Sequence, residues 1–211
     1  MPHARRRKSA VMPRLGRNDP PIRIFKSDRL ERFTLISINM FLGVWIPLLL
    51  LQIVLVISEA QGAGKTIGMI AGGLVVWFIF EYVMHRFLFH LKSGNRHIDA
   101  LVWMMHTNHH IQPSHRLRTL MPLSVSLPLA ALFELGAIAV FGLATGTALM
   151  AGFVLGYFIY DLTHYACHNF EMKSPWAARV KRHHLKHHYV SDEHNFSITV
   201  PFIDSLFSTR D

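Results

Sequence analysis

Four groups of histidines carry the chemistry that this sequence can support. They are HRFLFH (85–90), HTNHH (106–110), HYACH (164–168) and HHLKHH (183–188), and together they hold eleven of the 15 histidines. Neutral imidazole is the commonest protein ligand for metal ions. Spacings of three and four residues place two rings on one face of a helix, one turn apart. One such pair is often an accident of a polar face, but four groups in one chain indicate a metal site.

The available donors restrict the metal. The single cysteine, Cys167, excludes an internal disulfide and a thiolate cluster. Nitrogen donors suit iron, copper or zinc and disfavour magnesium or calcium. About ten imidazoles exceed what one ion can use, so we expect two ions at the spacing of paired metal sites. His3, His97 and His115 lie outside the groups and are expected at the surface, and the role of His194 stays open.

Four long apolar segments must position these groups. They cover residues 33–57, 67–80, 120–142 and 147–163, and the second and fourth continue helically into histidines. The first exceeds the ~20 residues needed to cross a bilayer. Hydrophobic residues make up 51% of the chain and charged residues only 17%, unlike a soluble domain. We therefore expect an all-α integral membrane bundle of four transmembrane helices with a cytoplasmic, histidine-rich, metal-binding cap. Glu134, inside the third segment, should face other helices or a polar cavity.

The basic residues fall on one side of these segments. Of the 22 Lys and Arg, all but Lys65 lie in the N-terminal segment 1–32, the loop 86–119 or the tail 169–211. The positive-inside rule then places both termini and every histidine group on the cytoplasmic face, with a bacterial inner membrane as the expected location. Residues 1–32 are expected to form a flexible basic arm beside anionic lipid, and residues 33–211 one domain. The net charge of +9 does not indicate nucleic-acid binding, because no stacking aromatic residues are interleaved with it on a soluble face.

The histidine groups lie within longer motifs that occur in a fixed order. These are EYVMHRFLFH (81–90), MHTNHH (105–110), YDLTHYACH (160–168) and KRHHLKHH (181–188), followed by FSITVPFIDSLFST (196–209). In these motifs the sequence resembles the integral-membrane fatty acid hydroxylase superfamily, and within it most closely the fatty acid 2-hydroxylases. Ser197 stands where the family usually has Gly, and Pro201-Phe202-Ile203-Asp204 replaces the usual Leu-Trp-Asp.

The resemblance implies a non-haem di-iron centre, in whose nitrogen sites zinc can replace iron in purified samples. The implied ligands are His85, His90, His106, His109, His110, His164, His168, His184, His187 and His188. His183 matches a motif position that the resemblance does not make a ligand, and we expect it beside the centre. Asp161 and Glu81 precede ligands by three and four residues, and we expect them to accept hydrogen bonds from imidazole N–H groups and so fix the tautomers.

The resemblance also implies an activity. A C–H bond of a lipid acyl chain would be hydroxylated, at C2 of a fatty acid or of a sphingolipid N-acyl group, with O2 as co-substrate. No fused haem domain is recognised, so the two electrons are expected from a separate carrier of ferredoxin or cytochrome-b5 type. Two alternatives remain. One is a sterol or carotenoid hydroxylase or desaturase with the same di-iron core, and the other is a non-enzymatic membrane protein that transports or stores metal.

Overall fold

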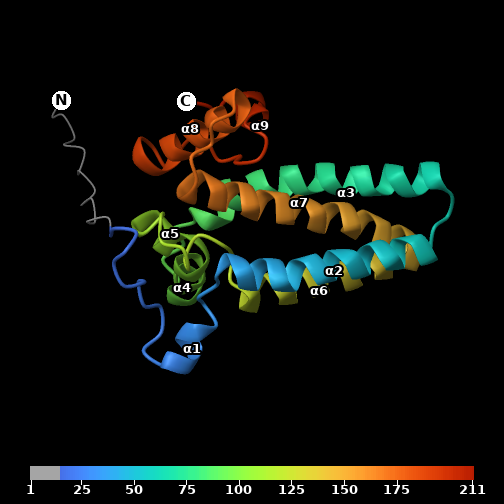
Figure 1. The fold of residues 1–211 in the computed structure, drawn as a ribbon, viewed down its shortest axis with the longest axis horizontal. Helices are drawn as coiled ribbons and strands as arrows, with labels where there is room; N and C mark the ends of the chain where they lie inside the picture. The colour runs from blue at the N-terminus through green and yellow to red at the C-terminus, as the bar shows by residue number, and fades with distance from the viewer. Residues whose placement is uncertain (1–14) are drawn as a thin grey trace.

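Four long helices form a bundle that carries a helical cap at one end (Figure 1). The computed structural model describes residues 15–211. The bundle consists of α2 (Ile38–Ser58), α3 (Ala63–Val83), α6 (Leu123–Phe141) and α7 (Leu143–Asn169). Each is long and apolar enough to cross a membrane, and the span that contains α3 continues to Phe89. The predicted four apolar helices are confirmed, and the chain is a multi-pass membrane protein.

Helix α7 is the centre of the bundle, and α3, α6 and α2 all pack against it. Glycines allow the closest approach. A Cβ atom added to Gly73 of α3 would lie 1.8 Å from the carbonyl oxygen of Leu149 in α7. One added to Gly152 of α7 would lie 1.9 Å from the carbonyl oxygen of Ile70. The backbones of α3 and α7 therefore touch where no side chain fits between them.

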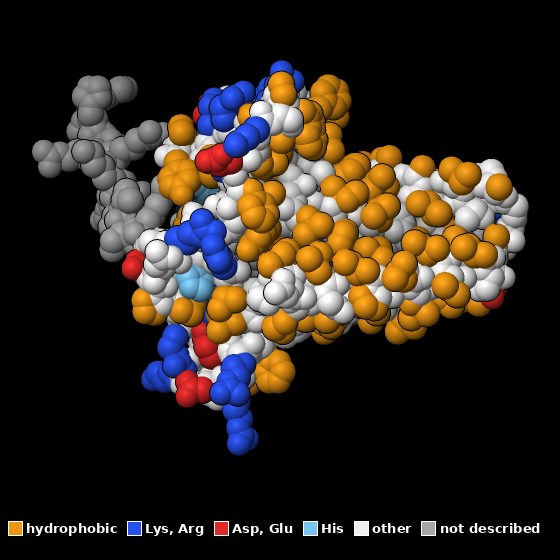
Figure 2. Space-filling model, viewed as in Figure 1, with side chains coloured by type: hydrophobic (Ala, Val, Ile, Leu, Met, Phe, Trp, Pro, Cys, Tyr) orange, Lys and Arg blue, Asp and Glu red, His pale blue; other side chains and the backbone are white. Residues whose placement is uncertain are grey.

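The outer surface of the bundle is hydrophobic, whereas Lys and Arg side chains gather on the cap (Figure 2). Leu135 and Val140 of α6 are 67% and 73% exposed. Inside, the rings of Trp45 and Trp77 pack against Tyr157 with centroid distances of 4.8 and 5.4 Å. An apolar outer surface is what a lipid environment requires, because side chains on that surface face hydrocarbon and not water.

Polar groups inside the bundle pair with each other. The Glu134 carboxylate accepts hydrogen bonds from the Gln52 amide at 3.1 and 3.3 Å, and the same amide donates to the Thr147 carbonyl at 3.0 Å. The expectation that Glu134 faces other helices is confirmed. The turn between α6 and α7 is tight: Gly142 alone separates the two helices, with a φ of +79°.

The cap is built from shorter helices around the C-terminal end of α7. The charge pattern predicts that this end faces the cytoplasm. The cap helices are α1 (Asp28–Arg32), η1 (Met84–Phe89), α4 (Arg96–Val102), η2 (Trp103–Thr107), α5 (Asn108–Ile111), α8 (Pro175–Tyr189) and α9 (Phe202–Leu206). The elements η1 and η2 are π-helical. Helix α8 starts with a Ser174 cap and Pro175 in its first turn, a favourable combination at a helix start.

The second half of the expected basic arm is held against the cap. Buried Arg118 forms an ion pair with Glu31 and donates a hydrogen bond to the Thr34 carbonyl at 3.1 Å. The Gln112 side chain accepts from the Ile22 N–H at 3.0 Å and donates to three carbonyls between residues 16 and 20. Residues 1–14 lie outside the described residues, and the expectation of flexibility stays a prediction for them.

Candidate metal centre

All ten histidines that the resemblance implies as ligands converge at the cap end of the bundle. The first histidine group contains His85, His90, His106, His110 and His187, and the second contains His109, His164, His168, His184 and His188. Within each group, one ring nitrogen of every member lies within 4.8 Å of the others. The members come from η1 and the residue that follows it, and from η2, α5, α7 and α8, so the tertiary fold assembles both groups from distant segments.

Helix geometry divides the HTNHH motif between the two groups. His106 and His110 are four residues apart, share one helix face and belong to the first group, whereas His109 points to the second. His85 and His90 are five residues apart, which in an α-helix separates the side chains by about 140°. The π-helix η1 removes this offset, and the two rings lie 5.2 Å apart in the first group.

Helix α8 is divided in the same way. His184 and His188 are four residues apart and face the second group, where His164 and His168 of α7 meet them. His187, rotated by one position, faces the first group. One helix therefore supplies both groups, and the two groups lie side by side.

The Nε2 atoms face one another within each group. In the first group, His106 Nε2 lies 2.8 Å from His110 Nε2 and 3.1 Å from His85 Nε2. In the second, His109 Nε2 lies 2.8 Å from His164 Nε2. Two nitrogens bound at right angles to one ion, each at about 2.0–2.1 Å, would be about 2.9 Å apart. Each group therefore has the donor spacing of a single bound metal ion.

Two backbone carbonyls fix the proton positions on two histidines of the first group. His85 Nδ1 lies 2.5 Å from the carbonyl oxygen of Phe196, and His187 Nδ1 lies 2.7 Å from that of His194. A carbonyl oxygen only accepts hydrogen bonds, so each Nδ1 carries the proton. Each Nε2 then presents a lone pair to the centre of the first group. His194, whose role the sequence leaves open, contributes through its backbone.

Burial keeps these imidazoles neutral, because a low-dielectric environment disfavours the charged form. It lowers the pKa of His90 and of His187 to about 4. Burial, followed by the charges of neighbouring imidazoles, lowers the pKa of further members well below its ordinary value: His106, His109, His110, His184 and His188. Neutral rings with converging lone pairs suit a cation, and both groups are able to hold metal ions.

The two predicted carboxylates act differently from expectation. Glu81 accepts three hydrogen bonds, of 2.7 to 2.9 Å, from Ile198 and Thr199. Asp161 accepts one from the Tyr157 hydroxyl at 2.8 Å and one from a backbone N–H. Among residues 15–211, neither carboxylate accepts a hydrogen bond from an imidazole. They hold the segments around the histidines rather than the rings, because each carboxylate is enclosed by other donors.

His183 belongs to neither group and pairs with a residue that sequence reasoning missed, while its expected place beside a metal centre stays a prediction. Its Nε2 lies 2.9 Å from Asp204 Oδ2, and both side chains are buried. Asp204 also accepts from the N–H groups of Phe196 and Ser197, each at 2.8 Å. In the sequence, this closing segment supports the resemblance and contains the departures from the family pattern, and no role was predicted for Asp204. Ser197 has no left-handed backbone conformation, so a glycine is not needed there.

For the histidines outside the two groups, one expectation of surface exposure is confirmed and one is wrong. His97 is exposed, as expected. His115 is only 8% exposed, so the prediction that it lies at the surface is wrong. The loop that carries it folds back on itself, and the Leu117 N–H donates to His115 Nδ1 at 3.3 Å. His3 lies outside the described residues.

An apolar cavity of about 170 Å³ lies between the long helices, next to the histidines. A smaller polar cavity adjoins it and is lined by His106, His109 and His164. The two cavities share four lining residues: Phe89, Met105, Met121 and Tyr160. We infer that the smaller cavity forms a passage from the apolar cavity to both histidine groups.

Two aromatic rings flank this passage, and each stacks on a histidine of a different group. Phe89 stacks on His106 with a centroid distance of 5.1 Å and an interplanar angle of 24°. Tyr160 stacks on His164 at 5.9 Å and 20°. A chain that passes between these rings is directed to the space between the groups.

A multi-pass helical bundle with two buried five-histidine groups and an adjoining apolar cavity defines a membrane metalloenzyme. The sequence model of the fatty acid hydroxylase family matches residues 70–209. The chain belongs to the fatty acid hydroxylase family and is an oxidoreductase of that family.

Individual relatives agree with this assignment. Dihydroceramide fatty acyl 2-hydroxylase FAH1 of Arabidopsis thaliana is 32% identical over 187 residues, which cover 89% of this chain and 79% of that protein. Fatty acid 2-hydroxylase of Rattus norvegicus is 30% identical over 210 residues, covering 90% of this chain and 56% of the rat protein. A solved structure of full-length scs7p, with only the hydroxylase domain visible, is similar with a TM-score of 0.80 at 28% identity. That similarity covers 86% of this chain and 69% of scs7p.

Proposed function

We propose that this chain is a di-iron 2-hydroxylase. It converts a C2–H bond of a lipid acyl chain, in a free fatty acid or a sphingolipid N-acyl group, into C2–OH. The observation that carries the proposal is the apolar cavity that leads, between Phe89 and Tyr160, to both histidine groups. Relatives named for acyl 2-hydroxylation, on dihydroceramide or fatty acids, support the choice of substrate.

When bound, the two iron ions supply activation of O2 with two external electrons, so that one oxygen atom enters the C–H bond and the other leaves as water with two protons. The ten histidines of the two groups hold the ions. The carbonyls of Phe196 and His194 keep the rings of His85 and His187 in the tautomer that binds metal. The cavity orients the acyl chain and keeps water from the reacting carbon.

Metal analysis of the protein purified in detergent tests the ligand set. His109 belongs to the second group and His187 to the first, so His109→Ala and His187→Ala should each lose one of about two metal ions per chain. His97→Ala, at an exposed histidine, should keep both. Zinc in place of iron would retain the site, because both suit nitrogen donors. A folded protein without stoichiometric metal would overturn the proposal.

Product analysis tests the reaction. The iron-loaded protein is supplied with an acyl lipid, a chemical reductant and isotopically labelled O2, and the lipids are analysed by mass spectrometry. The expected product carries one labelled oxygen atom at C2. Oxidation of an added sterol or carotenoid with the acyl chains left intact would show that the substrate assignment is wrong.

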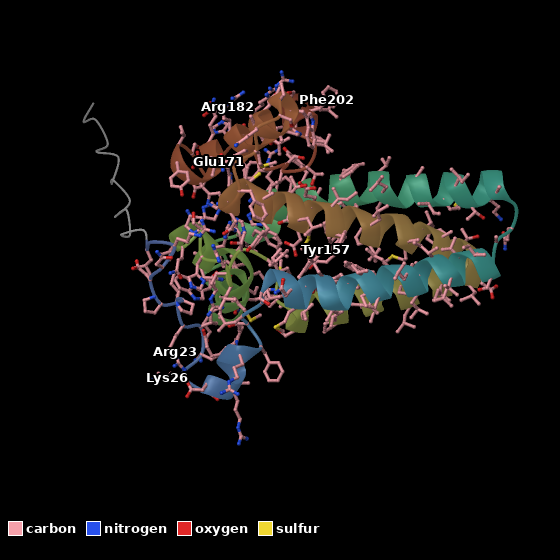
Figure 3. All side chains as sticks on the ribbon, viewed as in Figure 1. Arg23, Lys26, Tyr157, Glu171, Arg182 and Phe202 are labelled. Atoms are coloured by element: carbon pink, nitrogen blue, oxygen red, sulfur yellow. The ribbon has the colours of Figure 1, made fainter. Side chains whose placement is uncertain are left out.

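The electrons come from a separate acidic carrier of ferredoxin or cytochrome-b5 type. Helix α8 turns its ligand histidines inward and exposes Arg179, Arg182 and Lys186, and Arg182 points away from the bundle (Figure 3). These three side chains are spaced by three and four residues, so they form one basic helix face that suits an acidic partner. A partner bound there lies on the opposite side of α8 from the metal ligands. Arg182→Glu should slow carrier-driven turnover and leave turnover with a small chemical reductant unchanged. Equal slowing of both would exclude this docking face.

The cap and both termini face the cytoplasm, in a bacterial inner membrane. The support is the distribution of charge, since the sequence has only Lys65, in the first turn of α3, as Lys or Arg between residues 33 and 85 or between residues 119 and 172. A reporter active only in the cytoplasm should work when fused after Asp211. Activity only of a periplasmic reporter at the same position would reverse the orientation.

A further inference from the structure

The apolar cavity ends partway along the bundle. On α7 its lining begins at Phe153 and runs toward the histidines through Tyr157 and Tyr160. On α6 its lining ends at Phe133. Eleven residues separate Phe153 from His164, which is about 16 Å along the helix axis. The cavity therefore occupies only the half of the bundle that is nearest the histidines.

Three phenylalanine rings meet at this end of the cavity, where Trp77, nearly one turn farther from the histidines than Phe80, also lines it. The Phe153 ring lies 5.3 Å from the Phe80 ring and 5.7 Å from the Phe133 ring, between centroids. The Phe80 and Phe133 rings lie 5.6 Å apart at an angle of 84°. The rings come from α3, α6 and α7, so they meet from three sides. We call Phe80, Phe133 and Phe153 the cavity floor.

Beyond the floor, the helices leave no path for a further chain. The α3 and α7 backbones touch at Gly73, where an added Cβ would lie 1.8 Å from an α7 carbonyl oxygen. The α6 and α7 backbones approach at Gly146, where an added Cβ would lie 2.7 Å from Ala137. Gln52 of α2 binds Glu134 of α6 across the same region. Closely packed helices thus bound the cavity at this end.

We propose that the cavity floor sets the length of the acyl chain that the protein accepts. This inference rests on the proposed function, which places the reacting carbon at the passage between Phe89 and Tyr160. The chain then extends away from the histidines until its methyl end meets Phe133 and Phe153. Each methylene that fits should strengthen binding roughly fourfold. Once the chain reaches the floor, further methylenes gain nothing, because they must bend or leave the cavity.

Two substitutions on α6 should move this limit in opposite directions. Phe133→Ala removes a half-buried floor ring and should admit longer chains. Ala130→Leu adds volume to the lining nearly one turn closer to the histidines and should admit only shorter ones. Leu132→Ala is the matched control, because Leu132 lies on the same helix but is 62% exposed.

The test measures affinity against chain length for the metal-loaded protein in detergent. Saturated fatty acids of graded length displace a fluorescent fatty acid, and metal content verifies folding. Wild type should show a length at which affinity stops rising. We expect that length to increase in Phe133→Ala, decrease in Ala130→Leu and stay constant in Leu132→Ala. If Phe133→Ala loses its metal, Phe133→Leu replaces it, with a smaller increase expected.

The length profile of hydroxylated products, from an equimolar mixture of acyl lipids, should move in the same directions. An unchanged chain-length limit in metal-containing Phe133 and Ala130 variants would overturn the proposal that the cavity floor sets this length. If the wild type forms no hydroxylated product but the binding limit of the variants changes as expected, the proposed function is overturned and the cavity floor remains supported. The two failures are therefore distinguishable.

Discussion

His183 Nε2 lies 2.9 Å from Asp204 Oδ2, and this buried pair ties α8 to the C-terminal segment. The same carboxylate accepts the Phe196 N–H at 2.8 Å. The Phe196 carbonyl in turn accepts from His85. A residue outside both histidine groups therefore positions a member of the first group through one loop.

Replacing Asp204 with Asn should lower the metal affinity of the first histidine group. The amide adds an N–H₂ donor to a site already occupied by backbone donors, so the loop that presents the Phe196 carbonyl should shift. Loss of such outer hydrogen bonds typically lowers metal affinity 10- to 100-fold. Chelator competition on the purified protein measures the affinity of each ion. Glu193→Gln, at an exposed carboxylate, serves as control. Unchanged affinity in Asp204→Asn would mean that the loop is held by other contacts.

Arg118→Ala should detach the ordered part of the N-terminal segment. Glu31 would remain buried without its ion-pair partner, a change that typically costs about 3–5 kcal/mol. We expect a lower unfolding temperature and faster proteolysis between residues 15 and 32. Arg116→Ala removes an exposed arginine two positions away and should change neither. Equal protection of the segment in both variants would contradict the anchoring role of Arg118.

Gly73→Ala should destabilise the bundle by forcing α3 away from α7. Its Cβ would lie 1.8 Å from the Leu149 carbonyl oxygen, a contact that only a backbone shift relieves. Overpacking of this kind costs about 1–3 kcal/mol. Gly68→Ala on the same helix has nothing within 4 Å of the new Cβ and should be neutral, or stabilising by about 0.5–1 kcal/mol. Thermal unfolding in detergent compares the two, and equal unfolding temperatures would exclude a tight α3–α7 contact.

The metal-free protein should lose stability as the pH falls. Burial lowers the pKa of His90 and of His187 from 6.5 to about 4. Between these values the unfolded chain binds protons that the folded chain does not, so the free energy of unfolding decreases from pH 6.5 toward pH 4. Protons also compete with metal for the same lone pairs, so metal loss should follow the same direction. Unfolding temperatures and metal content across this range test the prediction. A constant unfolding temperature would show that the rings are solvated.

Several features were predictable from local sequence alone. Four apolar segments, of which the second and fourth continue helically into histidines, predicted the four helices of the bundle. In lipid a single span must satisfy its own backbone hydrogen bonds, which favours a helix. The spacing of His164 and His168 predicted two rings on one face of α7, and they share the second group. Glu134 predicted a polar neighbour inside the bundle, and Gln52 provides it.

Other features depended on contacts that leave no local pattern. The division of the HTNHH motif between the groups depends on where η1, α7 and α8 approach it. Glu81 binds Thr199, more than a hundred positions away, instead of a histidine. The Phe196 carbonyl holds His85 across a separation of 111 residues, and every residue has such a carbonyl. Helical period acts within one segment, so the sequence determined the elements, and the charge bias between segments predicts the side of the membrane. Which groups meet across segments depends on packing, and only the tertiary structure decided the hydrogen bonds around the histidines and the floor of the cavity.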